Sequence, residues 1–238
     1  RLPISPNSIK PTKPASMISP EILITADGSH TLLHPTFKTT YHSIHGALKE
    51  SQVVFIENGL QEINKTGIPI SVFEFGFGTG LNAWLSLEFA LTEKLAIEYT
   101  VIEIDPITES TWSQLNYPNI HPFPNGKYYF DQLHHAPWNQ RSILSDFFNI
   151  EKRTLDWREF NPSSKFDLIY FDAFAPESQA ELWLEDSLKK LYKLLKPGGL
   201  LLTYCAKGIF KRRLKSVGFQ VESLKGPPGK REITRAIK

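Results

Sequence analysis

Hydrophobic and polar positions alternate along this 238-residue chain with the periods of buried strands and amphipathic helices. Apolar runs predict strands at residues 70–75, 97–105, 165–174 and 199–205, and a shorter strand at 152–157. Apolar residues spaced three and four apart predict helices over 81–91, 180–196 and 209–217. This strand–helix alternation is typical of an α/β fold with a doubly wound, mostly parallel sheet.

Both ends of the chain depart from this alternation. Residues 219–238 predict a hairpin around the sequence GPPG, which makes the last strand antiparallel. Near the start, residues 21–34 predict two short strands joined at Asp27–Gly28, and residues 46–65 predict a helix. The predicted divisions are an extended or disordered arm (1–21), a small N-terminal extension of hairpin and helix (22–68) and the α/β domain (69–238).

Three closely spaced glycines, Gly76, Gly78 and Gly80, follow the first core strand. Glycine at such a turn lets a ligand approach bare backbone at the carboxyl end of the strand. The dinucleotide fingerprint G-x-G-x-x-G fits poorly, because Leu81 occupies its third glycine position. The spacing Glu74-x-Gly-x-Gly-x-Gly is instead the usual opening of class I S-adenosylmethionine (SAM) methyltransferases. A carboxylate such as Glu74 is favourable near the sulfonium and amino group of SAM, and a purely structural turn is the alternative.

Acidic residues after the next two strands support the SAM interpretation. Glu103 ends the second strand, where a carboxylate can bind both ribose hydroxyls. Asp105 is the alternative, although Pro106 indicates that the strand has already turned there. Asp156 is predicted to end the third strand near the adenine amino group, and Trp157 either covers that ring or packs in the core. A helix cap or a solvated loop is the alternative for each acid. The predicted cofactor-binding residues are Glu74, Gly76, Gly78, Gly80, Asn82, Glu103, Asp156 and Trp157.

A second motif, Asp172-x-Phe174-x-Pro176 at the end of the fourth strand, is not a general feature of methyltransferases. It occurs together with the runs HSIHGALKESQVVFIENGL, FGFGTGLN, LLKPGGLLLTYCAKG and VGFQVESLKGPPGKREITRA. With this combination the chain resembles, over residues 22–238, the methyltransferase domain of the MnmC-type tRNA 5-methylaminomethyl-2-thiouridine biosynthesis family. Long members of that family also carry a flavin-dependent oxidase domain, and this chain resembles the stand-alone members without it.

The resemblance implies a SAM-dependent N-methyltransferase that converts 5-aminomethyl-(2-thio)uridine to 5-methylaminomethyl-(2-thio)uridine at the tRNA wobble position. A protonated alkylamine has no lone pair, so its neutral form must be favoured or its proton removed, and a carboxylate at the edge of the SAM site can orient the amine and accept its proton, directly or through water. Asp172 is the predicted catalytic residue, and a cap on the following loop is the alternative role. Phe174 is predicted to stack on the extruded uracil, and Pro176 to shape the rim of the pocket.

Charge is distributed unevenly along the chain, although its net value is only +2. Beyond Cys205 only two acids, Glu222 and Glu232, accompany a series of basic residues. These basic residues are Lys207, Lys211, Arg212, Arg213, Lys215, Lys225, Lys230, Arg231, Arg235 and Lys238. Such a basic segment indicates phosphate contacts with a tRNA partner, and Lys207, Lys230 and Arg231 are the predicted substrate-binding members. A solvated helix face is the alternative explanation for KRRLK.

Other features limit the possible functions. A single cysteine, Cys205, excludes an intramolecular disulfide framework, and no apolar run approaches the roughly 18 residues of a membrane span. We therefore expect a cytoplasmic protein with no membrane partner; the oligomeric state stays open, with a monomer favoured. The histidine pairs lack zinc-ligand spacing, so we expect no metal.

Tyr41, His42 and Ser43 precede the first predicted helix, where they are expected to close over the cofactor or the base, or, for Ser43, to cap the helix. Three other functions stay open at this point. The first is a methyltransferase for a small-molecule amine or carboxylate, and the second is a non-catalytic RNA-binding protein. The third, a nicotinamide reductase, is disfavoured by Leu81.

Overall fold

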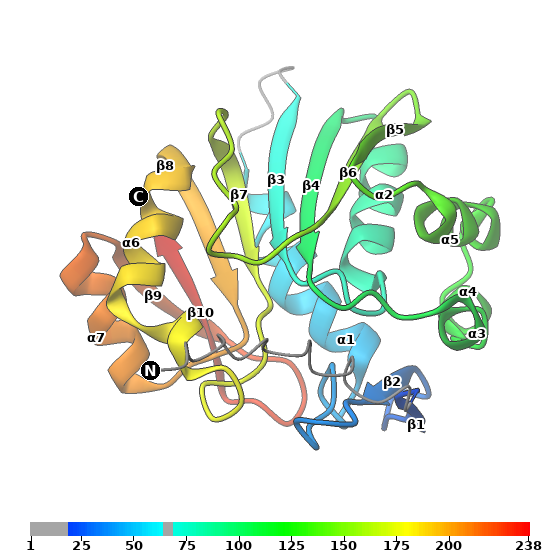
Figure 1. Cartoon of the computed structure of the whole chain (residues 1–238), viewed down its shortest axis with the longest axis horizontal. Coiled ribbons are helices and arrows are strands. Elements are labelled where there is room, and N and C mark those ends of the chain that lie inside the picture. Colours follow the sequence, from blue (N-terminus) through cyan, green and yellow to red (C-terminus); the bar gives the residue numbers. More distant parts are fainter. Residues whose placement is uncertain (1–18, 64–68) are drawn as a thin grey trace, which may run out of the picture.

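A central sheet of eight strands runs through the computed structural model, which describes residues 19–63 and 69–238 (Figure 1). Its strands are β3 (Ile70–Phe75), β4 (Ile97–Glu103), β5 (Gln140–Ser145), β6 (Phe148–Thr154), β7 (Phe166–Phe171), β8 (Leu195–Thr203), β9 (Gln220–Lys225) and β10 (Glu232–Ile237). Their order across the sheet is β5-β6-β4-β3-β7-β8-β10-β9. Residues 1–18 of the predicted arm lie outside the described residues.

Neighbouring strands in the middle of this sheet run parallel to one another. β3 pairs in parallel with β4 and β7, β4 pairs with β6, and β7 pairs with β8. β10 is antiparallel to both of its neighbours, β8 and β9, and its arrow in Figure 1 points against that of β8. The predicted α/β fold, with a doubly wound sheet and an antiparallel last strand, is confirmed. The parallel strands therefore bring their carboxyl ends to one edge of the sheet.

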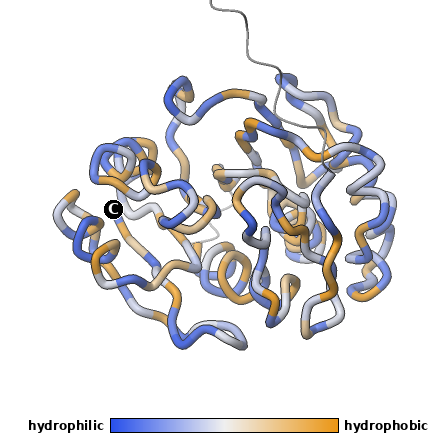
Figure 2. The backbone as a smooth tube through the Cα atoms, turned by 60° about the horizontal axis from the view of Figure 1, so that its bottom comes forward, coloured by the Kyte–Doolittle hydropathy of each residue, from blue (hydrophilic) through white to orange (hydrophobic). Residues whose placement is uncertain are grey.

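Helices cover both faces of the sheet. They are α1 (Ala47–Ser51), α2 (Leu81–Glu93), α3 (Glu109–Trp112), α4 (Tyr117–Ile120), α5 (Gly126–His135), α6 (Glu185–Leu194) and α7 (Gly208–Val217). Successive side chains of β3 point to opposite faces, so that Val72 joins the core beneath α2 and Phe73 joins the core beneath α6 and α7. In Figure 2 the hydropathy of the residues along the outer helices alternates between hydrophobic and hydrophilic. Among the described residues, no helix combines the length and apolar character needed to cross a membrane.

The third core strand differs from its prediction. β6 spans Phe148–Thr154 rather than 152–157, and its antiparallel neighbour β5 was not predicted. The inward positions of β6 include Lys152, which is only 1% exposed and interrupts the apolar pattern. Its ammonium group donates to the carbonyl oxygens of Leu133 and His134, both at 2.8 Å, at the end of α5. The strand was misplaced because a charged residue stands at an inward position, where the carbonyl groups at the end of a helix satisfy its ammonium group.

Two predicted helices are also broken. The helix predicted over 46–65 is α1, a π-helical stretch Gln52–Glu57 and a 3₁₀ turn Leu60–Glu62, and its last two residues lie outside the described residues. The helix predicted over 180–196 is a 3₁₀ turn, Ala180–Trp183, followed by α6. β8 begins directly after α6, so that Pro197 belongs to the strand, and it ends at Thr203.

A separate two-stranded sheet of β1 (Glu21–Ile24) and β2 (His30–Leu33) confirms the N-terminal hairpin. The loop between these strands caps the start of α1. Ser29 Oγ accepts hydrogen bonds from the amides of Ala47 and Leu48, at 3.2 and 3.1 Å, and Asp27 Oδ2 accepts one from Lys49 at 3.0 Å. These bonds satisfy free N–H groups of the helix and fix the position of α1, which carries Glu50 toward the site described below.

Candidate active site

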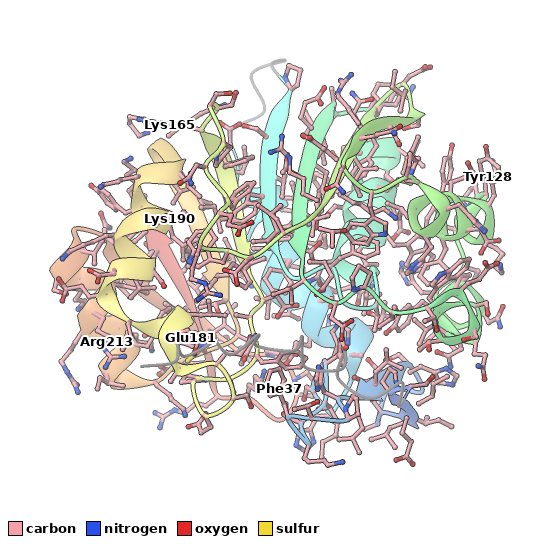
Figure 3. All side chains as sticks on the ribbon, viewed as in Figure 1. Phe37, Tyr128, Lys165, Glu181, Lys190 and Arg213 are labelled. Atoms are coloured by element: carbon pink, nitrogen blue, oxygen red, sulfur yellow. The ribbon has the colours of Figure 1, made fainter. Side chains whose placement is uncertain are left out.

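A cavity of ≈ 890 Å³ opens where the parallel strands end. Its walls combine segments far apart in sequence, such as Phe37 and Glu181, which both lie toward the lower edge of the molecule in Figure 3. The predicted site residues that line the cavity are Gly76, Gly78, Asn82, Glu103, Asp156, Trp157, Asp172, Phe174 and Lys230. Those that do not line it are Glu74, Gly80, Pro176, Lys207 and Arg231. The volume lies within the range of about 300–1,000 Å³ typical of ligand pockets.

The glycine loop has the backbone conformation that its sequence predicts. Gly76, Gly78 and Gly80 have φ values of 89°, 50° and 74°, in the region that side chains rarely adopt. Gly76 and Gly78 present backbone to the cavity. Gly80 precedes α2, where an added Cβ would lie 2.9 Å from His134 Nε2 and 3.0 Å from the Phe77 ring. Gly80 therefore permits the turn and its packing rather than lining the cavity.

Glu103 ties the end of β4 to this loop. Its Oε2 accepts a hydrogen bond from the Gly78 amide at 3.1 Å. Its Oε1 accepts hydrogen bonds from the amides of Ile104, at 2.8 Å, and Asp105, at 3.0 Å. Burial raises the pKa of Glu103, although these three backbone hydrogen bonds oppose the effect. A carboxylate offers about four acceptor positions, so Glu103 retains capacity for a further donor. Asp105 also lines the cavity and is exposed.

Asp156 and Trp157 lie on a loop beyond the end of β6. Asp156 accepts hydrogen bonds from the Arg158 guanidinium at 2.8 and 2.6 Å, and this pairing lowers the pKa of Asp156 to about 2. The Trp157 ring packs against Phe73 and Phe75, with ring centroids 6.1 and 5.3 Å apart. Trp157 therefore belongs to the core as well as to the cavity wall.

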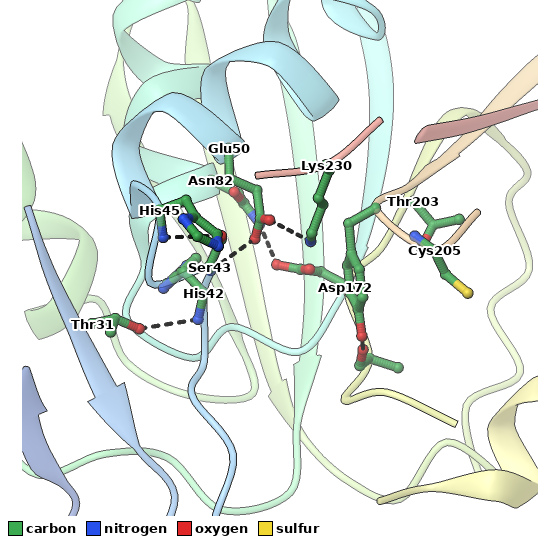
Figure 4. Close-up of polar contacts among 12 residues, drawn as sticks. Thr31, His42, Ser43, His45, Glu50, Asn82, Asp172, Thr203, Cys205 and Lys230 are labelled. Carbon is green, nitrogen blue, oxygen red and sulfur yellow. Dashed lines mark hydrogen bonds and ion pairs between the residues drawn. The ribbon is translucent and has the colours of Figure 1, made fainter. Parts of the chain in front are cut away.

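Asn82 joins the buried carboxylate of Glu74 to the half-buried carboxylate of Asp172 at the inner end of the cavity. Its Nδ2 donates to Glu74 Oε1 and to Asp172 Oδ2, both at 2.9 Å (Figure 4 shows the second bond). Glu74 is fully buried, and burial raises its pKa well above the usual range. Burial, followed by the charge of Glu50, raises the pKa of Asp172 to about 7. Within the described residues the Asn82 Oδ1 atom is buried without a hydrogen-bond partner.

Sequence reasoning missed an ion pair beside Asp172. Lys230, which precedes β10, donates to Glu50 Oε2 on α1, and the same carboxylate accepts a bond from the Ser43 amide at 3.1 Å (Figure 4). The Lys230 ammonium also lies 4.1 Å from the centre of the Tyr204 ring. The sequence does contain an indication that Glu50 is buried. It lies on the same helical face as the apolar residues at positions 47 and 54.

Four aromatic rings gather at the mouth of the cavity. Phe174 makes edge contacts with His34, Phe37 and Tyr41 at centroid distances of 5.1, 5.1 and 5.2 Å. Tyr41 also lies 3.1 Å from the position that a Cβ at Gly78 would take. The segment from His34 to Ser43 therefore closes over the glycine loop, although only Tyr41, His42 and Ser43 were expected there.

A second hollow of ≈ 500 Å³ adjoins the cavity and shares Ala175, Tyr204 and Lys230 with it. Pro176, Lys207 and Arg231 all line this second hollow, together with Cys205, Ala206 and Glu232. Lys207 pairs with Glu177. Arg231 is exposed and has no ion-pair partner in the part of the chain that the structure describes. Pro176, Lys207 and Arg231 therefore lie together in the second hollow rather than in the cavity.

In the described part of the chain, four of the ten basic residues beyond Cys205 form ion pairs with acids, among them Lys207 and Lys230. Lys211 pairs with Glu232, and Arg235 pairs with both Glu222 and Glu62. Within residues 19–63 and 69–238, the basic residues beyond Cys205 without such an acidic partner are Arg212, Arg213, Lys215, Lys225, Arg231 and Lys238. Of these only Arg231 lines the second hollow, which makes it the best-placed free cation.

Comparison with known sequences identifies the class of protein. Residues 145–238 match the profile of a family described as S-adenosyl-L-methionine-dependent methyltransferase. The glycine loop, the acid at the end of β4 and the strand order agree with that match. The chain therefore has the α/β fold of class I SAM-dependent methyltransferases, and its C-terminal part matches a family of such enzymes.

Individual relatives are more specific. The chain is 27% identical over 244 residues to the tRNA 5-methylaminomethyl-2-thiouridine biosynthesis bifunctional protein MnmC of Cupriavidus necator, covering 97% of this chain and 35% of that protein. It is 30% identical over 232 residues to MnmC of Burkholderia thailandensis, covering 85% and 33%. The solved structure of MnmC2 from Aquifex aeolicus matches with a TM-score of 0.75 and 26% identity, covering 92% of this chain and 70% of that one. The resemblance inferred from sequence motifs is confirmed, and the chain spans about a third of the length of these curated relatives.

Proposed function

We propose that this chain methylates the primary amine of 5-aminomethyl-(2-thio)uridine at the wobble position of tRNA, in the cytoplasm. The observation that carries the proposal is the position of Asp172, held by Asn82 between the glycine loop and the aromatic mouth of one cavity. The names of the MnmC relatives support the same substrate. A carboxylate at this point lies where the bound cofactor and the uracil of the substrate would meet.

The residues of the cavity fit SAM. Gly76 and Gly78 leave room for a ligand against the backbone, Glu103 has spare acceptor capacity for one ribose hydroxyl, and Asn82 Oδ1 lacks a partner among the described residues. Asp156 and Trp157 are the proposed residues at the adenine end. Glu74 acts indirectly, because it contacts Asn82 rather than the cavity. When bound, SAM supplies a methyl group attached to a positively charged sulfur.

Asp172 handles the proton of the acceptor amine. It accepts one proton from the substrate ammonium, which frees the lone pair on nitrogen. The nitrogen then forms its bond to the methyl carbon while the carbon–sulfur bond breaks, so that the product leaves as a secondary ammonium. A base works best when its pKa lies near the operating pH, and burial raises the pKa of Asp172 to about 7.

The aromatic rim and the second hollow suit a nucleotide substrate. Phe174 offers a ring at the mouth of the cavity, beside Tyr41, on which an extruded uracil can stack. Pro176 shapes the second hollow, next to Ala175, which lines both the cavity and this hollow. Arg231 in that hollow has no acidic partner among the described residues, which supports a contact with a phosphate next to the target nucleotide, and Lys207 can join this contact by exchanging Glu177 for the phosphate.

Nucleoside mass analysis tests this function. tRNA that carries 5-aminomethyluridine at the wobble position is incubated with the protein and SAM, then digested. We expect a mass gain of one methyl group on that nucleoside, with loss of activity as salt rises. Methylation of the free nucleoside as fast as of tRNA would instead identify a small-molecule methyltransferase.

A further inference from the structure

Charged side chains from three separate elements meet beside the reacting position. Glu50 comes from α1, Asp172 follows β7, and Lys230 precedes β10 (Figure 4). The Lys230 side chain is 26% exposed and that of Glu50 only 7%, so both are largely removed from water. Lys230 is fixed by its bond to Glu50 and by the Tyr204 ring at 4.1 Å. An ammonium group held in this way is poorly placed to bind an RNA phosphate.

The charge balance of this group determines how firmly an arriving amine keeps its proton. With both carboxylates ionised, the two acids and Lys230 carry one net negative charge, which a substrate ammonium would neutralise. Without Lys230 the two remaining acids of this group would carry two negative charges. Nearby negative charge favours the protonated amine, which cannot attack a methyl group. Lys230 therefore opposes the excess stabilisation of the ammonium form that Glu50 would otherwise cause.

We infer that Lys230, held by Glu50, is an electrostatic positioning residue that lowers the proton affinity of the methyl acceptor, rather than a phosphate contact. This inference rests on the proposed amine methylation. The other titratable or charged groups around these three residues are Asp27, His42, Glu74, Glu177, Tyr204, Cys205 and Lys207. His42 and Glu74 are buried, and Glu177 pairs with Lys207, so Glu50 is the partner that Lys230 directly neutralises.

Lys230→Met tests the inference, since it keeps the stem and removes the charge. Single-turnover methylation of tRNA is measured from pH 6 to 10 at saturating SAM. We expect the rising limb of the profile, which depends on loss of a proton from both Asp172 and the bound amine, to move about one unit toward alkaline pH, with roughly tenfold less activity at pH 7. KM for tRNA and its salt dependence should be unchanged. Lys230→Arg should behave like the wild type.

The double variant Lys230→Met with Glu50→Gln supplies the decisive comparison. It removes one charge of each sign, so the wild-type net charge returns and the pH profile should move back toward wild type. Lys211→Met is the matched control, because Lys211 forms an ion pair with Glu232 of β10 outside the cavity and is 16% exposed. It should leave the profile unchanged. Melting curves for every variant establish that the fold is retained.

Three results would overturn the inference. One is a Lys230→Met profile that is unshifted, with a raised KM and a weaker salt dependence, as a phosphate contact predicts. Another is a folded double variant that shows no recovery relative to Lys230→Met. If the double variant does not fold, a Lys230→Arg variant with the same alkaline shift as Lys230→Met would equally refute it. A wild-type protein that methylates no tRNA would instead refute the proposed function.

Discussion

Asp172→Asn is the most informative substitution in the proposed reaction. It keeps the volume of the side chain, and its amide oxygen can still accept the 2.9 Å bond from Asn82 that holds Asp172 in place. What disappears is the ability to accept a proton. The variant therefore separates proton transfer from the positioning of the substrate.

The size of the effect follows from the acceptor amine. With a pKa near that of lysine, about 10.4, only about one molecule in a thousand is neutral at pH 7.4. The wild-type carboxylate, whose pKa burial raises to about 7, is mostly ionised at that pH and can take the proton. The Asn variant must wait for the neutral fraction, so turnover should fall on the order of 10²–10⁴.

The pH dependence of single-turnover methylation provides the assay. Wild-type activity should rise through about pH 7 as Asp172 ionises and then level off. Activity of Asp172→Asn should instead rise about tenfold per pH unit up to roughly pH 10, which follows the neutral amine. SAM affinity, measured by titration, serves as the control and should be retained. Full activity at pH 7.4, or a deficit that is constant at every pH, would show that Asp172 does not act as the base.

Further predictions concern stability, the cofactor and RNA. Since the pKa of Asp172 is raised from 3.8 to about 7, the folded state alone binds this proton between these values, and stability falls as pH rises through that window. Asp172→Asn should therefore melt above the wild type at pH 8, with no difference near pH 4; equal melting points at pH 8 would contradict the shift. Glu103→Ala should weaken SAM binding by about 1.5–3 kcal/mol in a calorimetric titration, whereas an unchanged Kd would move the ribose role to Asp105. Arg231→Ala should weaken tRNA binding and reduce its log–log salt slope by about one, and loss of SAM affinity instead would place Arg231 at the cofactor.

Local sequence signals predicted the centre of the fold well. Three positive φ angles in five residues can be adopted without strain only by glycine, so Gly76, Gly78 and Gly80 marked the turn. The apolar runs predicted β3 and β7 because both strands are buried on both faces. β6 was misplaced because Lys152 occupies an inward position, where its charge is satisfied by carbonyls that the strand pattern does not reveal.

The candidate site shows the same division between local and long-range information. Asp172 and Glu103 were recognisable from the sequence because each ends a core strand, and parallel strands must end at one edge. The sequence alone thus determined the central parallel strands β3, β4 and β7, the glycine turn and the acids beside it. Only the tertiary structure could bring Asn82 to Asp172, 90 residues away, and Lys230 to Glu50, 180 residues away. Those contacts depend on how α2, the N-terminal hairpin and the last strands dock, and docking is decided by packing and charge balance across the whole fold rather than by any local pattern.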